Sequence, residues 1–120
     1  GFDVAAMTGA FLGAAACRLP VVIDGFISMV AALAAERMAP LTKGYLIASH
    51  ISKEQGYSHA LNALGLPPML NLEMRLGEGS GCPLAFQIIR GACAVMNHMA
   101  TFAEAEINDD YLVEIRKLNY

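Results

Sequence analysis

The stretch Pro20-Val21-Val22-Ile23-Asp24-Gly25 places three β-branched residues in a row immediately before an acid and a glycine. A short apolar run of this kind is typical of a strand that is buried on both faces. Pro20 fits only at the beginning of such a strand, because proline cannot donate a hydrogen bond to a neighbouring strand. Residues 26–38 then have a helical pattern. The order strand, acid, glycine and helix predicts one unit of an α/β fold.

The same order recurs further along the chain. Pro40 ends the first helix, because proline lacks the N–H group that another turn would need. A second strand is predicted at residues 45–49 and a second helix at residues 53–64, with Gly65 as the residue that closes it. Alternating strands and helices indicate a parallel sheet covered by helices. We therefore predict the α/β class.

A further helix is predicted before the first strand, over residues 3–17, with Asp3 as its N-cap. Small residues recur on this helix at a spacing of four, including Gly9 and Gly13. They give it a flat face on which another backbone can pack closely. We expect this helix to be covered on both sides.

The end of the chain is predicted to contain a long helix over residues 82–106. Residues 107–120 are more polar and are predicted to form a C-terminal tail or a short helix from Tyr111. We therefore expect one α/β domain over residues 1–106, followed by this tail.

The composition restricts the classes of protein to which the chain can belong. Hydrophobic residues make up 56% of the 120 residues and charged residues only 16%, so we expect a homo-oligomer or a part of a larger protein. A net charge of −3 without a basic cluster argues against nucleic-acid binding. The longest uncharged stretch, residues 4–17, is shorter than the roughly 18 residues that cross a membrane. With no signal-peptide pattern, a cytoplasmic location is expected.

The three cysteines, Cys17, Cys82 and Cys93, are an odd number without C-x-x-C spacing. Their neighbours are mostly small or apolar. We expect buried free thiols rather than disulfides, and no metal site.

Polar residues follow both predicted strands. Asp24 ends the first, and Ser49, His50 and Ser52 end the second. Ligands bind at the carboxyl ends of strands in open α/β sheets, which makes these residues candidates for a site. For Asp24 the alternative is an N-cap of the following helix. For His50 the alternative is a structural residue held by hydrogen bonds.

Residues 75–81 read RLGEGSG, which places Glu78 between two glycines just before the long helix. Free N–H groups at the start of a helix favour anionic or electron-rich groups. A carboxylate held there can act as a general base or stabilise developing positive charge. The alternative is that Glu78 interacts only with the helix dipole and that Gly77 and Gly79 shape a turn.

Four ordered motifs carry a family resemblance: GFDVAAMTGAFLGAAA at 1–16, PVVIDGFIS at 20–28, YLIASHISKEQG at 45–56 and RLGEGSG at 75–81. Together they resemble the C-terminal third of the nicotinate-nucleotide–dimethylbenzimidazole phosphoribosyltransferase family. The resemblance implies a three-layer α/β/α domain with a parallel sheet, a small helical domain to which the last helix contributes, and a homodimer. It also implies that the 120 residues are a fragment, inactive alone, because the family's phosphate-contacting segment is missing.

The resemblance also implies a reaction. The family transfers phosphoribose from nicotinate mononucleotide to 5,6-dimethylbenzimidazole without a cofactor or an obligatory metal. Glu78 would be the catalytic base. The substrate-binding residues would be Asp24, Gly25, Ser52, Leu76, Gly77 and Gly79. The alternative is a non-catalytic oligomerisation or ligand-binding module that retains part of this fold.

Overall fold

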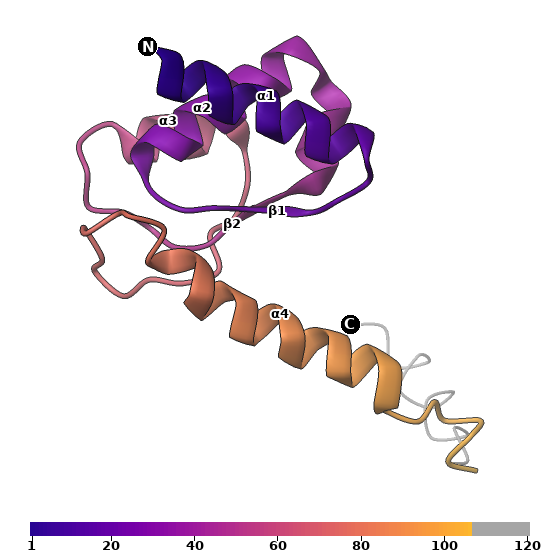
Figure 1. Ribbon diagram of the computed structural model, residues 1–120. Coiled ribbons are helices and arrows are strands. Elements are labelled where there is room, and N and C mark those ends of the chain that lie inside the picture. Colours follow the sequence, from indigo (N-terminus) through magenta and orange to yellow (C-terminus); the bar gives the residue numbers. More distant parts are fainter. Residues whose placement is uncertain (107–120) are drawn as a thin grey trace, which may run out of the picture. The chain divides into compact units, whose positions relative to one another are not determined.

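The computed structural model describes residues 1–106, which contain two short parallel strands and several helices (Figure 1). In chain order the elements are α1 (Phe2–Ala16), β1 (Val21–Ile23), α2 (Phe26–Met38), the 3₁₀ helix η1 (Pro40–Tyr45), β2 (Leu46–Ala48), α3 (Tyr57–Leu64) and α4 (Gly81–His98).

The two strands lie side by side in parallel, with Val21 opposite Leu46 and Ile23 opposite Ala48. Helices α1, α2 and α3 lie together on one side of them (Figure 1). After β2, His50 forms an isolated parallel bridge with Leu70. The predicted strands and the helix over residues 26–38 are confirmed, as is the parallel pairing.

The described chain divides within α4. Residues Gly1–Ile88 form one compact unit, and a second unit begins at Ile89. The domain end that we predicted at residue 106 is also the last described residue. The tail over residues 107–120, including the helix predicted from Tyr111, therefore lies outside the described residues.

The core of the first unit is formed by the strands together with α1, α2 and α3. Ile23, Met29 and Leu64 are almost completely buried there. Burial of side chains of this size contributes about 1.5–3 kcal/mol each. Thr8 on α1 adds a polar contact, because its hydroxyl lies 3.2 Å from the Ala31 carbonyl of α2. This core holds β1 and β2 in place under the loops that follow them.

The N-terminal helix differs from the prediction at its cap and on its outer face. Asp3 lies in the first turn of α1, and Gly1 is the N-cap, so the predicted capping role of Asp3 is wrong. Only Thr8 and Phe11 of this helix are buried. Gly9 and Gly13 are exposed, with open space where a side chain would project, so none of the residues 1–106 covers their face.

Helix α3 begins at Tyr57, four residues later than predicted. The preceding residues form a turn because Glu54 makes contacts elsewhere: its Oε2 accepts hydrogen bonds from Phe26 N–H at 2.8 Å and from the Ser52 hydroxyl at 2.9 Å. The predicted end is confirmed, since Gly65 has a left-handed φ of 65°.

Helix α4 ends at His98 and does not extend to Glu106 as predicted. A new turn follows, in which Glu104 Oε2 accepts the N–H of Thr101 at 2.8 Å and the Thr101 hydroxyl accepts the N–H of Glu104 at 3.3 Å. This reciprocal pair is a capping box, which favours the start of a separate turn over continuation of the helix. The carboxyl pKa of Glu104 is lowered by the hydrogen bonds that the backbone N–H of Thr101 and, secondarily, the Thr101 hydroxyl donate to it.

The cysteines are free thiols, as expected, but they are not all buried. Cys17 and Cys93 are exposed, and Cys82 is half-buried. Burial, and secondarily the negative charge of Asp24, raises the pKa of the Cys82 thiol. The predicted burial is wrong for Cys17, the C-cap of α1, and for Cys93 on α4, because no described residue covers either of them.

Candidate functional site

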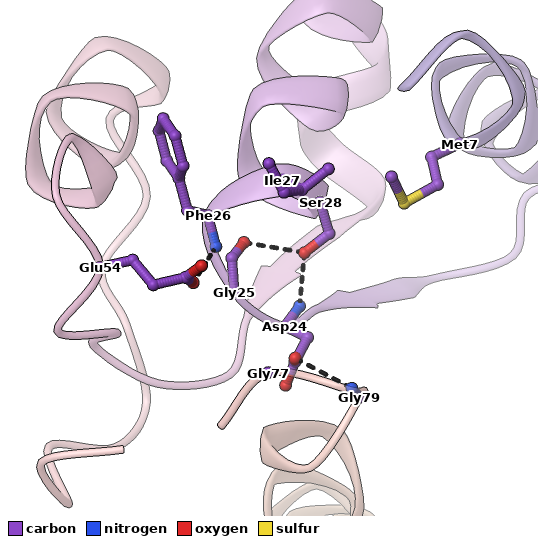
Figure 2. Close-up of a pocket in the computed structure, with 9 residues that line it drawn as sticks. All are labelled: Met7, Asp24, Gly25, Phe26, Ile27, Ser28, Glu54, Gly77 and Gly79. Carbon is purple, nitrogen blue, oxygen red and sulfur yellow. Dashed lines mark hydrogen bonds between the residues drawn. The ribbon is translucent and has the colours of Figure 1, made fainter. Parts of the chain in front are cut away.

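A hollow of about 300 Å³ lies where α2 begins, beside the carboxyl end of β1 (Figure 2). Its apolar wall comes from Met7 of α1 and from Phe26 and Ile27 at the start of α2. Two carboxylates, Asp24 and Glu54, face it from different loops. The remaining lining residues are Gly25, Ser28, Gly77 and Gly79.

Asp24 connects β1 to the glycine-rich loop before α4. Its Oδ2 accepts the N–H of Gly79 at 3.0 Å, and its Oδ1 accepts the N–H of Gly81 at 2.7 Å. Its own backbone N–H donates to the hydroxyl of Ser28 at 3.1 Å. Asp24 is therefore not the N-cap of α2, where Gly25 stands. Its carboxylate accepts the N–H groups of Gly79 and Gly81 at the beginning of α4. These N–H groups, which we expected to be free for a ligand, therefore already have an anionic partner.

Gly81 fits between Asp24 and a buried histidine. A Cβ at residue 81 would lie 2.1 Å from His50 Nδ1 and 2.8 Å from Ser49 Oγ. Both side chains are fully buried and joined to each other by a 2.9 Å hydrogen bond. A residue with a side chain therefore cannot replace Gly81 without displacing packed neighbours.

Glu54 is a residue of the hollow that our reading of the sequence did not single out. Through Oε2 it ties the Ser52 turn to the first N–H of α2. A Cβ at residue 25 would lie 2.7 Å from the same oxygen, so Gly25 allows this close approach. The signal was present in the sequence, because Glu54 lies within the polar motif that begins at Ser49.

The loop that carries Glu78 has an unusual backbone. Gly77, Glu78 and Gly79 have φ angles of 72°, 54° and 76°, so three consecutive residues occupy the left-handed region. That region disfavours a residue with a side chain by about 1–2 kcal/mol. Glycine accounts for the two outer positions, whereas Glu78 adopts the conformation at a cost. Its side chain is exposed.

The residues predicted to form a site come together only in part. Asp24, Gly25, Gly77 and Gly79 all line the hollow. Ser52 is buried behind it, with its hydroxyl bonded to Glu54. Leu76 is 74% exposed, and neither it nor Glu78 is a lining residue. Substrate contacts by any of these residues stay a prediction.

His50 and Tyr57 pack beneath the strand ends. The Tyr57 hydroxyl donates a hydrogen bond to the His50 carbonyl. Burial, with a smaller effect of the Asp24 charge, raises the pKa of Tyr57 to about 12. Within residues 1–106, His50 Nε2 and Ser80 Oγ are buried without a hydrogen-bond partner. His50 is otherwise held as a structural residue.

The described part of the chain has neither a metal-binding cluster nor a membrane-spanning helix. Over residues 1–106, no three His, Cys, Asp or Glu side chains come together as metal ligands could. No helix in the same range combines the length and apolar character needed to cross a membrane.

Comparison with known proteins gives consistent matches. The sequence model of a family described as Phosphoribosyltransferase matches residues 1–107. The nicotinate-nucleotide–dimethylbenzimidazole phosphoribosyltransferase of Clostridium perfringens is 60% identical over 116 residues, covering 97% of this chain and 32% of that protein. The protein of the same name from Escherichia coli is 57% identical over 107 residues, covering 89% of this chain and 30% of that protein.

The fold matches as well. A crystal structure of the Thermus thermophilus protein of this name superposes with a TM-score of 0.83 at 44% identity, covering 90% of this chain and 32% of that chain. The predicted α/β class, here in a chain rich in helix, is confirmed. The chain spans about a third of the length of the curated relatives that it matches. It belongs to the nicotinate-nucleotide–dimethylbenzimidazole phosphoribosyltransferase family.

Proposed function

We propose that this chain supplies one side of the active site of an enzyme that transfers phosphoribose from nicotinate mononucleotide to 5,6-dimethylbenzimidazole. The products are α-ribazole 5′-phosphate and nicotinate. The observation that carries the proposal is the glycine-flanked Glu78 loop, which is anchored to Asp24 at the edge of a hollow in a chain 60% identical to a relative of that name.

The chemistry requires one proton acceptor. Glu78 takes the N–H proton of the benzimidazole, and the other ring nitrogen attacks C1′ of the nucleotide. The bond from C1′ to the nicotinate nitrogen breaks, and its electron pair leaves with nicotinate. Positive charge develops on the ribose in the transition state. Until the proton has been transferred, the negative carboxylate also stabilises that developing charge.

The surroundings of Glu78 suit this role. The side chain is exposed and is not engaged in any described hydrogen bond or ion pair, so it is free to meet a substrate. Gly77 and Gly79 have no side chains to obstruct a flat ring. Leu76, also exposed, adds apolar surface beside them. Of the other residues predicted from the sequence to bind substrate, Gly25 lines the hollow, Ser52 bonds to Glu54 beside it, and Asp24 holds the loop itself. We also propose that the enzyme is a homo-oligomer in the cytoplasm. The phosphate of the nucleotide would be held by residues outside this chain.

The test is Glu78→Gln in the full-length natural protein, measured as nicotinate release from nicotinate mononucleotide with 5,6-dimethylbenzimidazole. We expect kcat to fall about 10²- to 10⁴-fold, the usual contribution of a general base. The nucleotide KM should change by less than about threefold, because ground-state binding is not removed.

Glu73→Gln is the matched control. Glu73 is also an exposed acid with a left-handed φ, of 55°, but it forms a surface ion pair with Lys53 at 2.8 Å. It should retain wild-type kcat. A Glu78→Gln variant with wild-type kcat would contradict the assignment. Nucleotide binding without any turnover in the wild-type protein would instead favour the non-catalytic ligand-binding module.

A further inference from the structure

We infer that Asp24 is a positioning residue, which acts on the reaction through the backbone of the Glu78 loop and not by contact with substrate. The inference rests on the proposed function of Glu78. It starts from an unusual feature of Asp24, whose two carboxylate oxygens are both bound to backbone N–H groups 55 and 57 residues away.

The loop needs an anchor because its conformation is not one that the chain adopts by itself. Three consecutive left-handed residues with Glu78 in the middle are disfavoured for an L-residue with a side chain. The local hydrogen bonds are a turn from Ser80 N–H to Gly77 O at 2.9 Å and one from Cys82 N–H to Gly79 O at 3.1 Å. Neither of these contacts fixes where the loop lies relative to β1.

Asp24 provides that fixation from a rigid position. It follows β1 directly, and its N–H is held by Ser28 on the first turn of α2. Asp24 is only 9% exposed, so water competes little for the two N–H groups. The N–H groups of Gly79 and Gly81 flank Ser80, so the loop end is fixed at two points immediately after Glu78.

A second contact restricts the loop from the other side. Gly81 packs against the His50 ring so closely that a Cβ would lie 2.1 Å from Nδ1. The His50 ring is fully buried and bonded to Ser49. Gly81 is therefore held between Asp24 and His50, and the peptide that follows Glu78 has a defined direction.

The first measurement does not depend on activity. In the full-length natural protein, Asp24→Asn keeps the size of the side chain but replaces one acceptor oxygen with an NH₂ group that faces an N–H donor. We expect the amides of residues 77–81 to exchange with deuterium at least about tenfold faster, because their anchored state opens more often. The matched control is Asp3→Asn, an acid in the first turn of α1, which should leave this exchange unchanged.

The second measurement is kinetic. Asp24→Asn should lower kcat about 10- to 100-fold, because misplacement of a reacting group by about 1 Å costs this much, with little change in nucleotide KM. In the Glu78→Gln background the same substitution should cost no further rate. A residue that bound substrate directly would still lower the rate in that background.

The outcomes separate the two proposals. Unchanged exchange in Asp24→Asn would overturn the anchoring, and faster exchange with unchanged kcat would overturn its link to the reaction. A further rate loss in the Glu78→Gln background would show that Asp24 contacts substrate itself. If Glu78→Gln alone has no effect, the proposed function of Glu78 fails, whereas faster exchange would still establish the anchor.

Discussion

At the carboxyl ends of β1 and β2, two carboxylates find partners within the chain, whereas the described residues leave the outer apolar face of α1 uncovered. Asp24 accepts two backbone N–H groups, and Glu54 accepts one together with the Ser52 hydroxyl. These contacts join three loops from distant parts of the sequence. Buried polar groups are costly without partners, so this region has one well-defined arrangement.

The outer face of α1, in contrast, consists of small and apolar residues that are exposed. It exposes Gly9 and Gly13 with open space above them, and Phe2 at the start of the same helix is 96% exposed. Among residues 1–106, Gly9 and Gly13 have no atom within 4 Å of where a Cβ would project, so nothing there defines a partner. The comparison shows that the loops after the strands have defined polar contacts while part of the apolar surface of α1 stays exposed among the described residues.

The largest effect should come from filling the tightest point of the polar region. Gly81→Ala places a methyl group 2.1 Å from His50 Nδ1 in a site where the histidine ring is fully buried. We expect a loss of about 3 kcal/mol in the free energy of unfolding, measured with urea, because overpacking forces buried side chains apart.

The control for Gly81→Ala is Gly91→Ala, in the middle of the same helix with nothing within 4 Å of its Cβ. That variant should gain up to about 1 kcal/mol from helix propensity. If Gly81→Ala also stabilised the protein, the close packing between Asp24 and His50 would be wrong.

The sequence predicted the elements whose signals are local. Three β-branched residues before Asp24 marked β1, and Pro40 marked the end of α2. It did not predict that α3 starts at Tyr57, because the Glu54 carboxylate accepts a hydrogen bond from the N–H of Phe26, 28 residues earlier. Long-range contacts of this kind leave no periodic pattern.

The candidate site was predictable to a similar extent. Asp24 and the glycines around Glu78 stood out by position and composition. The hydrogen bonds between Asp24 and these glycines could not be predicted, because an acid just before a helix is normally interpreted as the N-cap of that helix. The missing information was which of two helix starts, α2 or α4, the carboxylate would reach.

A smaller effect tests the buried polar layer through pH. Because Tyr57 has its pKa raised to about 12 from 10 in the unfolded chain, its phenol stays protonated in the fold where the unfolded chain already ionises. The resulting contribution of Tyr57 to the free energy of unfolding is complete below pH 10. It is lost as the pH rises towards 12, a loss on the order of 2–3 kcal/mol.

Tyr57→Phe isolates this contribution. The variant leaves the buried His50 carbonyl without its donor and should cost about 1–2 kcal/mol at neutral pH. Its stability should then fall less steeply than that of the wild type between pH 10 and 12. Parallel curves for the two proteins in denaturant titrations would show that Tyr57 is not the group that ionises.

The smallest effect concerns the outer face of α1 and has opposite signs in two measurements on the 120-residue chain. Gly13→Ala adds a methyl group where nothing lies within 4 Å, so α1 should gain about 0.5–1 kcal/mol in stability from the lower backbone entropy of the unfolded chain. If the flat face packs against a second copy, the same methyl group separates the two backbones and should weaken self-association on the order of tenfold in Kd, measured by light scattering across a dilution series. Gly44→Ala, at an exposed position with equal space outside α1, should leave association unchanged. A Gly13→Ala chain that associates as strongly as the wild type would show that the small residues of α1 do not form the contact, and that its exposed apolar ends, such as Phe2, are the place to look for it.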